Sequence, residues 1–207
     1  MNRIQQKRET RRKLIEAALA MSAERGFSSL SLREIAKAAG IAATGFYRHF
    51  RDLDELGLAL VDEVAVALRA LIREARRRTS DKGRLRTSIE TFLDYVRESP
   101  HHFRLLLGER LGGSVAFREA LRAEIALFVA ELSHDLAVQA RAAGMKAADL
   151  PLAAEAIVAV VFTVGAEALD LPRARHAALA ERIIGEVNLI LRGVGFVSRS
   201  AARRPAD

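Results

Sequence analysis

Hydrophobic positions recur with a helical period along most of the chain. Near the N-terminus, Leu14, Ala17, Ala18 and Met21 follow the spacing i, i+3, i+4, i+7, which predicts one buried face of a helix that ends at Gly26. The alternating pattern typical of strands is nearly absent, so the sequence predicts an all-α protein. Beyond residue 52, glycines and prolines separate expected helices over about 53–79, 84–98, 101–110, 114–143, 151–170 and 174–193.

A helix-turn-helix is predicted between residues 31 and 50. Ser31 and Glu34 have the spacing of a capping box, in which each side chain bonds to the backbone N–H of the other residue. The helix that they start is expected to end at Gly40, and a short third helix is expected over about 42–50. Two short helices joined by a tight glycine-containing turn are typical of DNA-binding proteins, although an ordinary helical hairpin has the same pattern.

Positive charge is concentrated in the first quarter of the chain. Residues 1–51 contain 11 Lys/Arg and four Asp/Glu, whereas residues 52–207 contain 22 of each. A basic N-terminal segment followed by a neutral remainder is expected of a protein whose N-terminal part binds nucleic-acid phosphates. A solvated basic tail would give the same composition. We therefore expect a three-helix DNA-binding domain over 1–52, a helical-bundle domain for ligand binding and dimerisation over 53–195, and a disordered tail over 196–207.

The residues that carry most enzyme chemistry are absent or wrongly spaced. The chain has no cysteine, which excludes disulfides, thiol catalysis and Cys-based zinc sites. His101 and His102 are adjacent, so on a helix they point in different directions, and neither a Walker loop nor a nucleophile elbow occurs. We expect no enzyme activity, no cofactor and no metal. The longest nearly uncharged apolar run, 156–166, is shorter than the ~20 residues of a membrane span, and no signal peptide is evident, so a cytoplasmic protein without membrane contact is expected.

The segment from Ser31 to Phe50, SLREIAKAAGIAATGFYRHF, resembles the DNA-binding signature of the TetR family of repressors. The resemblance implies a homodimer that binds a palindromic operator in double-stranded DNA. At one position where the family often has a phosphate-contacting lysine this chain has Leu53, and Arg51 is the candidate replacement. The elements at the family's spacing are Arg25-Gly26-Phe27, Ile35-Ala36, Ala39-Gly40-Ile41, Tyr47-Arg48-His49-Phe50 and Asp54-Glu55-Leu56.

The resemblance also assigns roles by position. It places Thr44, Gly45 and Phe46 near base edges, and it places Tyr47 and His49 at the phosphate backbone. The backbone N–H groups at the start of the second helix, near Ser31 and Leu32, would face a phosphate. Arg33 either reaches the groove or is a solvated surface residue. The expected DNA-binding residues are Lys7, Arg8, Ser31, Leu32, Arg33, Thr44, Gly45, Phe46, Tyr47, Arg48, His49 and Arg51.

Four further segments, 29–34, 46–57, 103–107 and 165–170, are similar to the branch of that family that represses unsaturated fatty acid synthesis. Members of the branch respond to long-chain acyl thioesters, which implies a small, mostly apolar ligand of that kind. Two alternatives stay open: a regulator of another pathway such as drug efflux, and a helical lipid-binding carrier with an incidental basic head.

The second domain is expected to hold both a ligand pocket and a dimer interface, because bundle helices enclose apolar pockets and twofold dimers are the common oligomer. In both cases the alternative is that the same residues fill the core of one chain. The expected pocket residues are Phe92, Val96, Phe103, Leu106, Leu107, Leu127, Phe128 and Val161, with Arg104 and Arg110 as candidates for an anionic head group. The expected interface residues are Val158, Phe162, Gly165, Leu169, Ile183, Val187, Ile190 and Leu191.

Overall fold

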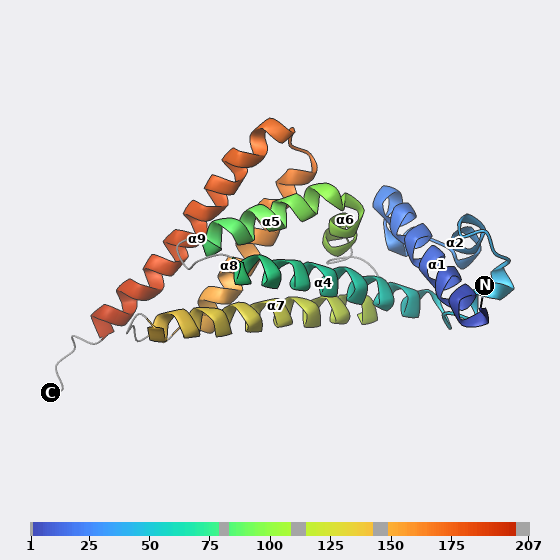
Figure 1. Cartoon of the computed structure of the whole chain (residues 1–207), viewed down its shortest axis with the longest axis horizontal. Helices are drawn as coiled ribbons and strands as arrows, with labels where there is room; N and C mark the ends of the chain where they lie inside the picture. Colours follow the sequence, from blue (N-terminus) through green and yellow to red (C-terminus); the bar gives the residue numbers. More distant parts are fainter. Residues whose placement is uncertain (1, 79–82, 109–114, 143–148, 202–207) are drawn as a thin grey trace. The chain divides into compact units, whose positions relative to one another are not determined.

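The computed structural model describes residues 2–78, 83–108, 115–142 and 149–201, and every regular element in these ranges is a helix (Figure 1). The predicted all-α class is therefore confirmed. The elements are α1 (Arg3–Arg25), the 3-10 turn η1 (Phe27–Ser29), α2 (Leu32–Ala38), α3 (Ala43–Phe46), α4 (Leu53–Arg77), α5 (Arg84–Glu98), α6 (Pro100–Gly108), α7 (Val115–Ala142), α8 (Leu150–Gly165), the 3-10 turn η2 (Ala166–Leu169) and α9 (Arg173–Ala201).

Most expected helix ends lie within a few residues of the observed ones. α3 is shorter than expected, because after Phe46 the chain continues in tight turns in which the His49 N–H donates to the Phe46 carbonyl at 2.8 Å. α9 extends to Ala201, six residues into the segment expected to be a tail, and residues 202–207 lie outside the described ranges. The breaks expected at 81–82, 111–113 and 144 also lie outside them.

Packing divides the chain into two compact units. The N-terminal unit comprises Met1–Leu68 and Glu98–Glu124, and the C-terminal unit comprises Arg69–Arg97 and Ile125–Asp207. The N-terminal unit thus extends beyond the boundary expected at residue 52, because residues of α4, α6 and α7 belong to its core. The buried residues of this core are Leu14, Ile15, Ala18, Phe27, Leu30, Ile35, Ala39, Phe46, Phe50, Leu56, Leu60, Val61, Leu105 and Phe117.

A close approach at Gly57 fixes α4 within the N-terminal unit. The rings of Phe27 and Phe117 lie side by side, with centroids 5.4 Å apart. A Cβ at position 57 would lie 2.8 Å from Cδ2 of Phe117 and 2.9 Å from Cε1 of Phe27, which is too close for any side chain. Glycine at this position therefore lets the two aromatic rings pack directly on the α4 backbone.

The C-terminal unit joins α4, α5, α7, α8 and α9 through both ion pairs and apolar packing. Arg73 and Arg76 of α4 pair with Glu131 and Asp135 of α7, each at 2.7 Å. On the apolar side, the ring of Phe92 in α5 packs against that of Phe162 in α8, with centroids 5.5 Å apart. These contacts hold the helices around a shared interior.

The stretch Leu150–Leu169, which comprises α8 and η2, is the single described segment long and apolar enough to cross a membrane by length and composition alone. Its buried residues include Ala154, Ile157 and Phe162, and it packs against α9. A helix that packs within a helical bundle can have the same composition.

Candidate DNA-binding and ligand-binding sites

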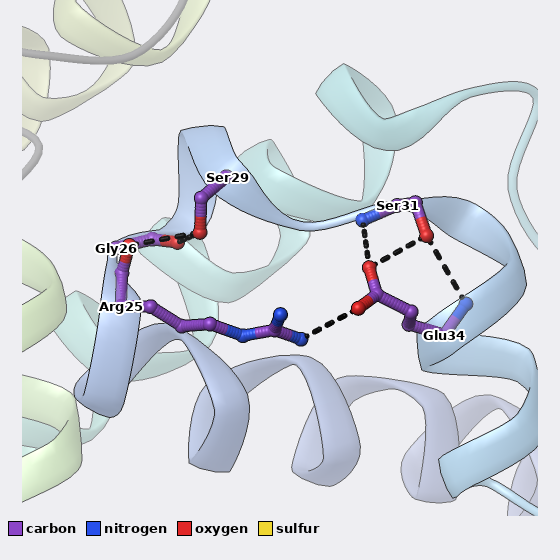
Figure 2. A network of polar contacts seen from close by, with 5 residues as sticks. All are labelled: Arg25, Gly26, Ser29, Ser31 and Glu34. Carbon is purple, nitrogen blue, oxygen red and sulfur yellow. Dashed lines mark hydrogen bonds and ion pairs between the residues drawn. The ribbon is translucent and has the colours of Figure 1, made fainter.

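A polar network holds the start of α2 against the end of α1 (Figure 2). Ser31 and Glu34 form the predicted capping box: the Glu34 N–H donates to Ser31 Oγ at 3.3 Å, and the Ser31 N–H donates to Glu34 Oε2 at 3.0 Å. The other carboxylate oxygen of Glu34 accepts from Nη2 of Arg25 at 2.9 Å. Hydrogen bonds from the Ser31 hydroxyl, Arg25 and the Ser31 N–H lower the pKa of Glu34 to about 2, so this carboxylate is charged at neutral pH.

The turn between α2 and α3 is closed by two backbone hydrogen bonds. The N–H of Ile41 donates to the Ala36 carbonyl at 2.9 Å, and the N–H of Gly40 donates to the Lys37 carbonyl at 3.1 Å. This pair defines a Schellman motif, which requires a left-handed residue after the helix. Gly40 has φ +74° and meets that requirement, so the turn that sets α3 against α2 depends on glycine here.

The residues of α3 and the turns after it divide into a buried and an exposed side. Thr44, Tyr47 and Arg48 are exposed, with Tyr47 at 63%, and His49 and Gly45 are intermediate. Phe46, which was expected near base edges, is instead completely buried between Tyr47 and Phe50, with ring centroids 6.0 and 5.7 Å away. Phe46 therefore anchors α3 to the core, whereas Thr44 and Tyr47 remain at the surface.

Cations from α1 and from the end of the helix-turn-helix gather around His49. Burial lowers the pKa of His49, and the positive charges of Lys7, Arg11 and Arg48 lower it further. Within the described part of the chain, Nδ1 of His49 is buried and has no hydrogen-bond partner. The guanidinium of Arg11 also lies over the ring of Phe50, 4.9 Å from its centroid. The sequence does not predict Arg11 in this site, because the stacking on Phe50 that places it near His49 has no sequence pattern.

Other cations of this unit are already engaged by carboxylates. Arg12 pairs with Glu9 at 2.7 Å and with Glu16 at 2.5 Å, and Nε of Arg51 pairs with Glu55 at 3.1 Å. Arg51 is therefore a weaker candidate for the phosphate contact than its exposed position suggests. Lys7, Arg8, Ser31 and Arg33 are exposed and Leu32 is intermediate, but the N–H of Ser31 is engaged by Glu34.

The C-terminal unit contains a cavity of about 440 Å³ between its helices. Three of the eight expected pocket residues line it, namely Phe92, Phe128 and Val161. Val96 is buried elsewhere on α5, and Leu127 on α7 is 47% exposed. Phe103, Leu106 and Leu107 lie on α6 in the N-terminal unit, as does Arg104, and Arg110 lies outside the described residues.

The residues expected at the dimer interface face mainly the interior of one chain. Val158, Phe162, Gly165, Ile183 and Val187 are buried, and Leu169, Ile190 and Leu191 are intermediate. Val158, Phe162, Val187 and Leu191 also line the cavity. The outward faces of α8 and α9 expose some apolar or small residues, namely Leu152 at 67%, Ala159, Gly185 and Leu189 at 69%, together with the charged residues Glu155 and Arg182.

Two family models match this chain. The model described as "Bacterial regulatory proteins, tetR family" matches residues 14–60, which include the helix-turn-helix. The model described as "Tetracyclin repressor-like, C-terminal domain" matches residues 81–190, which is more than half of the chain.

Solved structures share the fold at low sequence identity. A putative TetR-family regulator from Rhodococcus sp. is 23% identical, with a TM-score of 0.70 over 88% of this chain and 98% of the other. The fatty acid degradation regulator FadR from Bacillus halodurans is 18% identical, with a TM-score of 0.72 over 85% and 95%. AibR, solved in complex with isovaleryl coenzyme A and operator DNA, is 18% identical, with a TM-score of 0.67 over 86% and 97%.

Proposed function

We propose that this chain, which belongs to the TetR family of bacterial regulatory proteins, is a cytoplasmic repressor that binds a palindromic operator as a homodimer and responds to a long-chain acyl thioester. Members of the family are DNA-binding transcription factors rather than enzymes. The observation that carries the proposal is the exposed face of Thr44, Tyr47 and Arg48 beside the cations Lys7 and Arg11. Such a face offers side chains for base edges together with charges for the phosphates on either side.

In this proposal α3 enters the major groove and the cations around His49 bind the phosphate backbone. Thr44 is small and exposed near the start of α3, so the helix backbone can approach the base edges closely. The hydroxyl of Tyr47 and the guanidinium of Arg48 can each donate to a phosphate oxygen. Binding of this kind releases counterions, so affinity should fall steeply with salt concentration.

The dimer is proposed to form through the outward faces of α8 and α9. Leu152 and Ala159 in α8 are seven residues apart on one exposed face, and Gly185 and Leu189 occupy one exposed face of α9. Each of the two faces thus combines an exposed leucine with a small residue, which permits close helix packing across a twofold axis. Five of the eight residues that the sequence predicts at the interface are buried within the single chain, which supports the outward faces instead.

Two structural relatives support an acyl ligand. The fatty acid degradation regulator from Bacillus halodurans and the AibR complex with isovaleryl coenzyme A share this fold. The cavity of about 440 Å³ lies within the range of small-molecule sites, and its walls are mostly apolar, as an acyl chain requires. A regulator of drug efflux is the competing interpretation, because an apolar cavity also accommodates aromatic drugs.

The test is a binding measurement on DNA from upstream of fatty acid synthesis genes, with excess unrelated DNA as competitor, in the presence and absence of palmitoyl coenzyme A. We expect tight, salt-sensitive binding that survives the competitor and that palmitoyl coenzyme A changes. Specific binding that responds to cationic dyes but not to acyl thioesters would support the efflux interpretation. Tight binding of acyl ligands without any sequence-specific DNA binding would instead identify a lipid carrier.

A further inference from the structure

The cavity of the C-terminal unit has an aromatic wall. Phe92 of α5, Phe128 of α7 and Phe162 of α8 line it, and the ring of Phe162 lies 5.5 Å from that of Phe92 and 5.6 Å from that of Phe128, centroid to centroid. Such a cluster offers only carbon surface, so it favours an apolar group.

Polar residues line the cavity on α4 and farther along α5 and α7. Arg76 of α4 and Asp135 of α7 form an ion pair at 2.7 Å, and both contribute to the lining, as do Arg84 and Gln139. Asp135 follows Phe128 by seven residues on α7, and Arg84 precedes Phe92 by eight on α5. At 1.5 Å per residue these intervals correspond to about 10–12 Å, so the aromatic and the polar walls are at separate ends.

The two ends differ in charge as well as in polarity. The lining includes Arg76, Arg84 and Arg86 but one carboxylate, that of Asp135. Arg86 pairs outside the cavity with Glu181 and Glu90. The lining of the polar end therefore holds more guanidinium groups than carboxylates, and guanidinium groups bind anionic groups through charge-assisted hydrogen bonds.

Gly165 determines where the aromatic end closes. The Cβ of a residue larger than glycine at position 165 would lie 3.2 Å from Cζ and 3.4 Å from Cδ1 of Phe92, and closer still to Cε1. The ring of Phe92 thus occupies the space that a Cβ on α8 would need. An added methyl group must push this ring away from α8, and the ring itself forms part of the cavity wall.

We propose that the cavity holds an amphipathic anion in a single orientation, with its apolar chain against Phe92, Phe128 and Phe162 and its anionic group at Arg76, and that Gly165 sets the longest chain that fits. The inference rests on the proposed function, since this ligand is the one to which the regulator responds. Asp135 competes with the ligand for Arg76, so binding exchanges one carboxylate for the anionic group of the ligand.

The chain-length part is tested by calorimetric titration of the full-length protein with butyryl and palmitoyl coenzyme A. Gly165→Ala should weaken palmitoyl binding at least tenfold and leave butyryl binding nearly unchanged, because only the longer chain reaches Phe92. Adding Phe92→Leu to Gly165→Ala should restore palmitoyl binding, since the smaller side chain leaves room for the new methyl group. Gly108→Ala is the matched control, because nothing lies within 4 Å of a Cβ at that position in α6.

Thermal unfolding of each variant separates a change in the cavity from a general loss of structure. Three results would each overturn the assignment of Gly165. In the first, Gly165→Ala loses the same affinity for both chain lengths. In the second, its affinity for palmitoyl coenzyme A is unchanged, and in the third, Phe92→Leu fails to restore binding in a folded double variant.

The orientation is tested with Asp135→Asn and Arg76→Gln, each titrated with palmitoyl coenzyme A, palmitate and the neutral palmitamide. Asp135→Asn removes the competing carboxylate and should tighten the binding of palmitate and palmitoyl coenzyme A roughly tenfold. Arg76→Gln removes the guanidinium and should weaken the binding of both anions by a similar factor. The affinity for palmitamide should not change in either variant. Equal effects on palmitate and palmitoyl coenzyme A would identify a carboxylate-sized anion as sufficient, whereas effects confined to the thioester would assign Arg76 to the coenzyme phosphates. Weaker anion binding by Asp135→Asn, or an equal change for palmitamide, would contradict the orientation.

DNA binding by the ligand-free variants is measured in parallel. If the wild-type protein binds DNA specifically but none of these acyl compounds, this inference fails while the regulator stands. If it binds acyl compounds as described but no specific DNA, the proposed function fails while the assignment of the cavity stands.

Discussion

Nη2 of Arg25 lies 2.9 Å from Oε1 of Glu34, and this ion pair connects the last turn of α1 to the first turn of α2. The same carboxylate accepts hydrogen bonds from the hydroxyl and the N–H of Ser31. Glu34 therefore both caps α2 and connects it to α1.

We expect acid to weaken the N-terminal unit through Glu34. Its pKa in the folded chain is lowered to about 2, below the ~4.3 of an unfolded glutamate. The stabilisation is thus fully present above about pH 4.3 and is lost as the pH falls towards 2. The free energy of unfolding, measured with urea between pH 2 and 5, should fall less with acid for Glu34→Gln than for the wild type. The control Glu24→Gln should show the same fall as the wild type. An identical dependence of the unfolding free energy on pH in all three proteins would contradict this role.

Two neighbouring arginines should contribute differently to DNA binding. Arg11 lies near His49 and over Phe50, whereas Arg12 is held by Glu9 and Glu16. If Arg11 contacts a phosphate, Arg11→Gln should reduce the slope of log Kd against log salt by about one. Arg12→Gln should leave the slope unchanged, and the prediction is wrong if the two variants lose the same amount.

DNA binding should strengthen as the pH is lowered from 8 to 6. Burial and the charges of Lys7, Arg11 and Arg48 lower the pKa of His49, so its imidazole is neutral in the free protein at pH 7. A phosphate beside these cations would offset their charge and raise that pKa, so binding would take up a proton. Kd measured across this range should therefore fall severalfold for the wild type and remain flat for His49→Gln. A wild-type Kd independent of pH would remove His49 from the phosphate contact.

Charge on the outward face of α9 should disrupt the dimer. Leu189 is 69% exposed in the single chain, so Leu189→Glu should not disturb its core. In the proposed interface the new carboxylates would be buried opposite each other, and sedimentation should show monomers that bind a palindrome poorly. Val138→Glu on α7, where the native side chain is 50% exposed, is the control and should remain dimeric. A dimeric Leu189→Glu protein would place the interface elsewhere.

The sequence predicted the helices well because their signals are local. Periodic apolar residues, the Ser31 capping box and the glycine after α2 each act within a few residues, and the structure contains all three. The functional side chains were harder to assign, because burial of one side of a short helix depends on distant partners. Phe46 shows this, since Phe50 and the core around it exclude it from the surface.

The interior of the second domain was the least predictable part. An apolar residue on a helix has the same pattern whether it fills a core, lines a cavity or faces a second subunit. Phe103 and Phe92 look alike in sequence, yet the first is buried in the N-terminal unit and the second lines the cavity. The close fit of Gly165 against Phe92 joins residues more than 70 positions apart, and no local signal encodes it.

Sequence-specific DNA binding by a twofold dimer can be tested by selecting binding sites from random double-stranded DNA with the purified protein. We predict enrichment of a palindrome whose half-sites lie about one helical turn, ~34 Å, or a multiple of it apart, and we predict that Tyr47→Ala and Thr44→Ala weaken binding to it. Enrichment of no common sequence after repeated rounds, with binding that depends on salt alone, would contradict the claim.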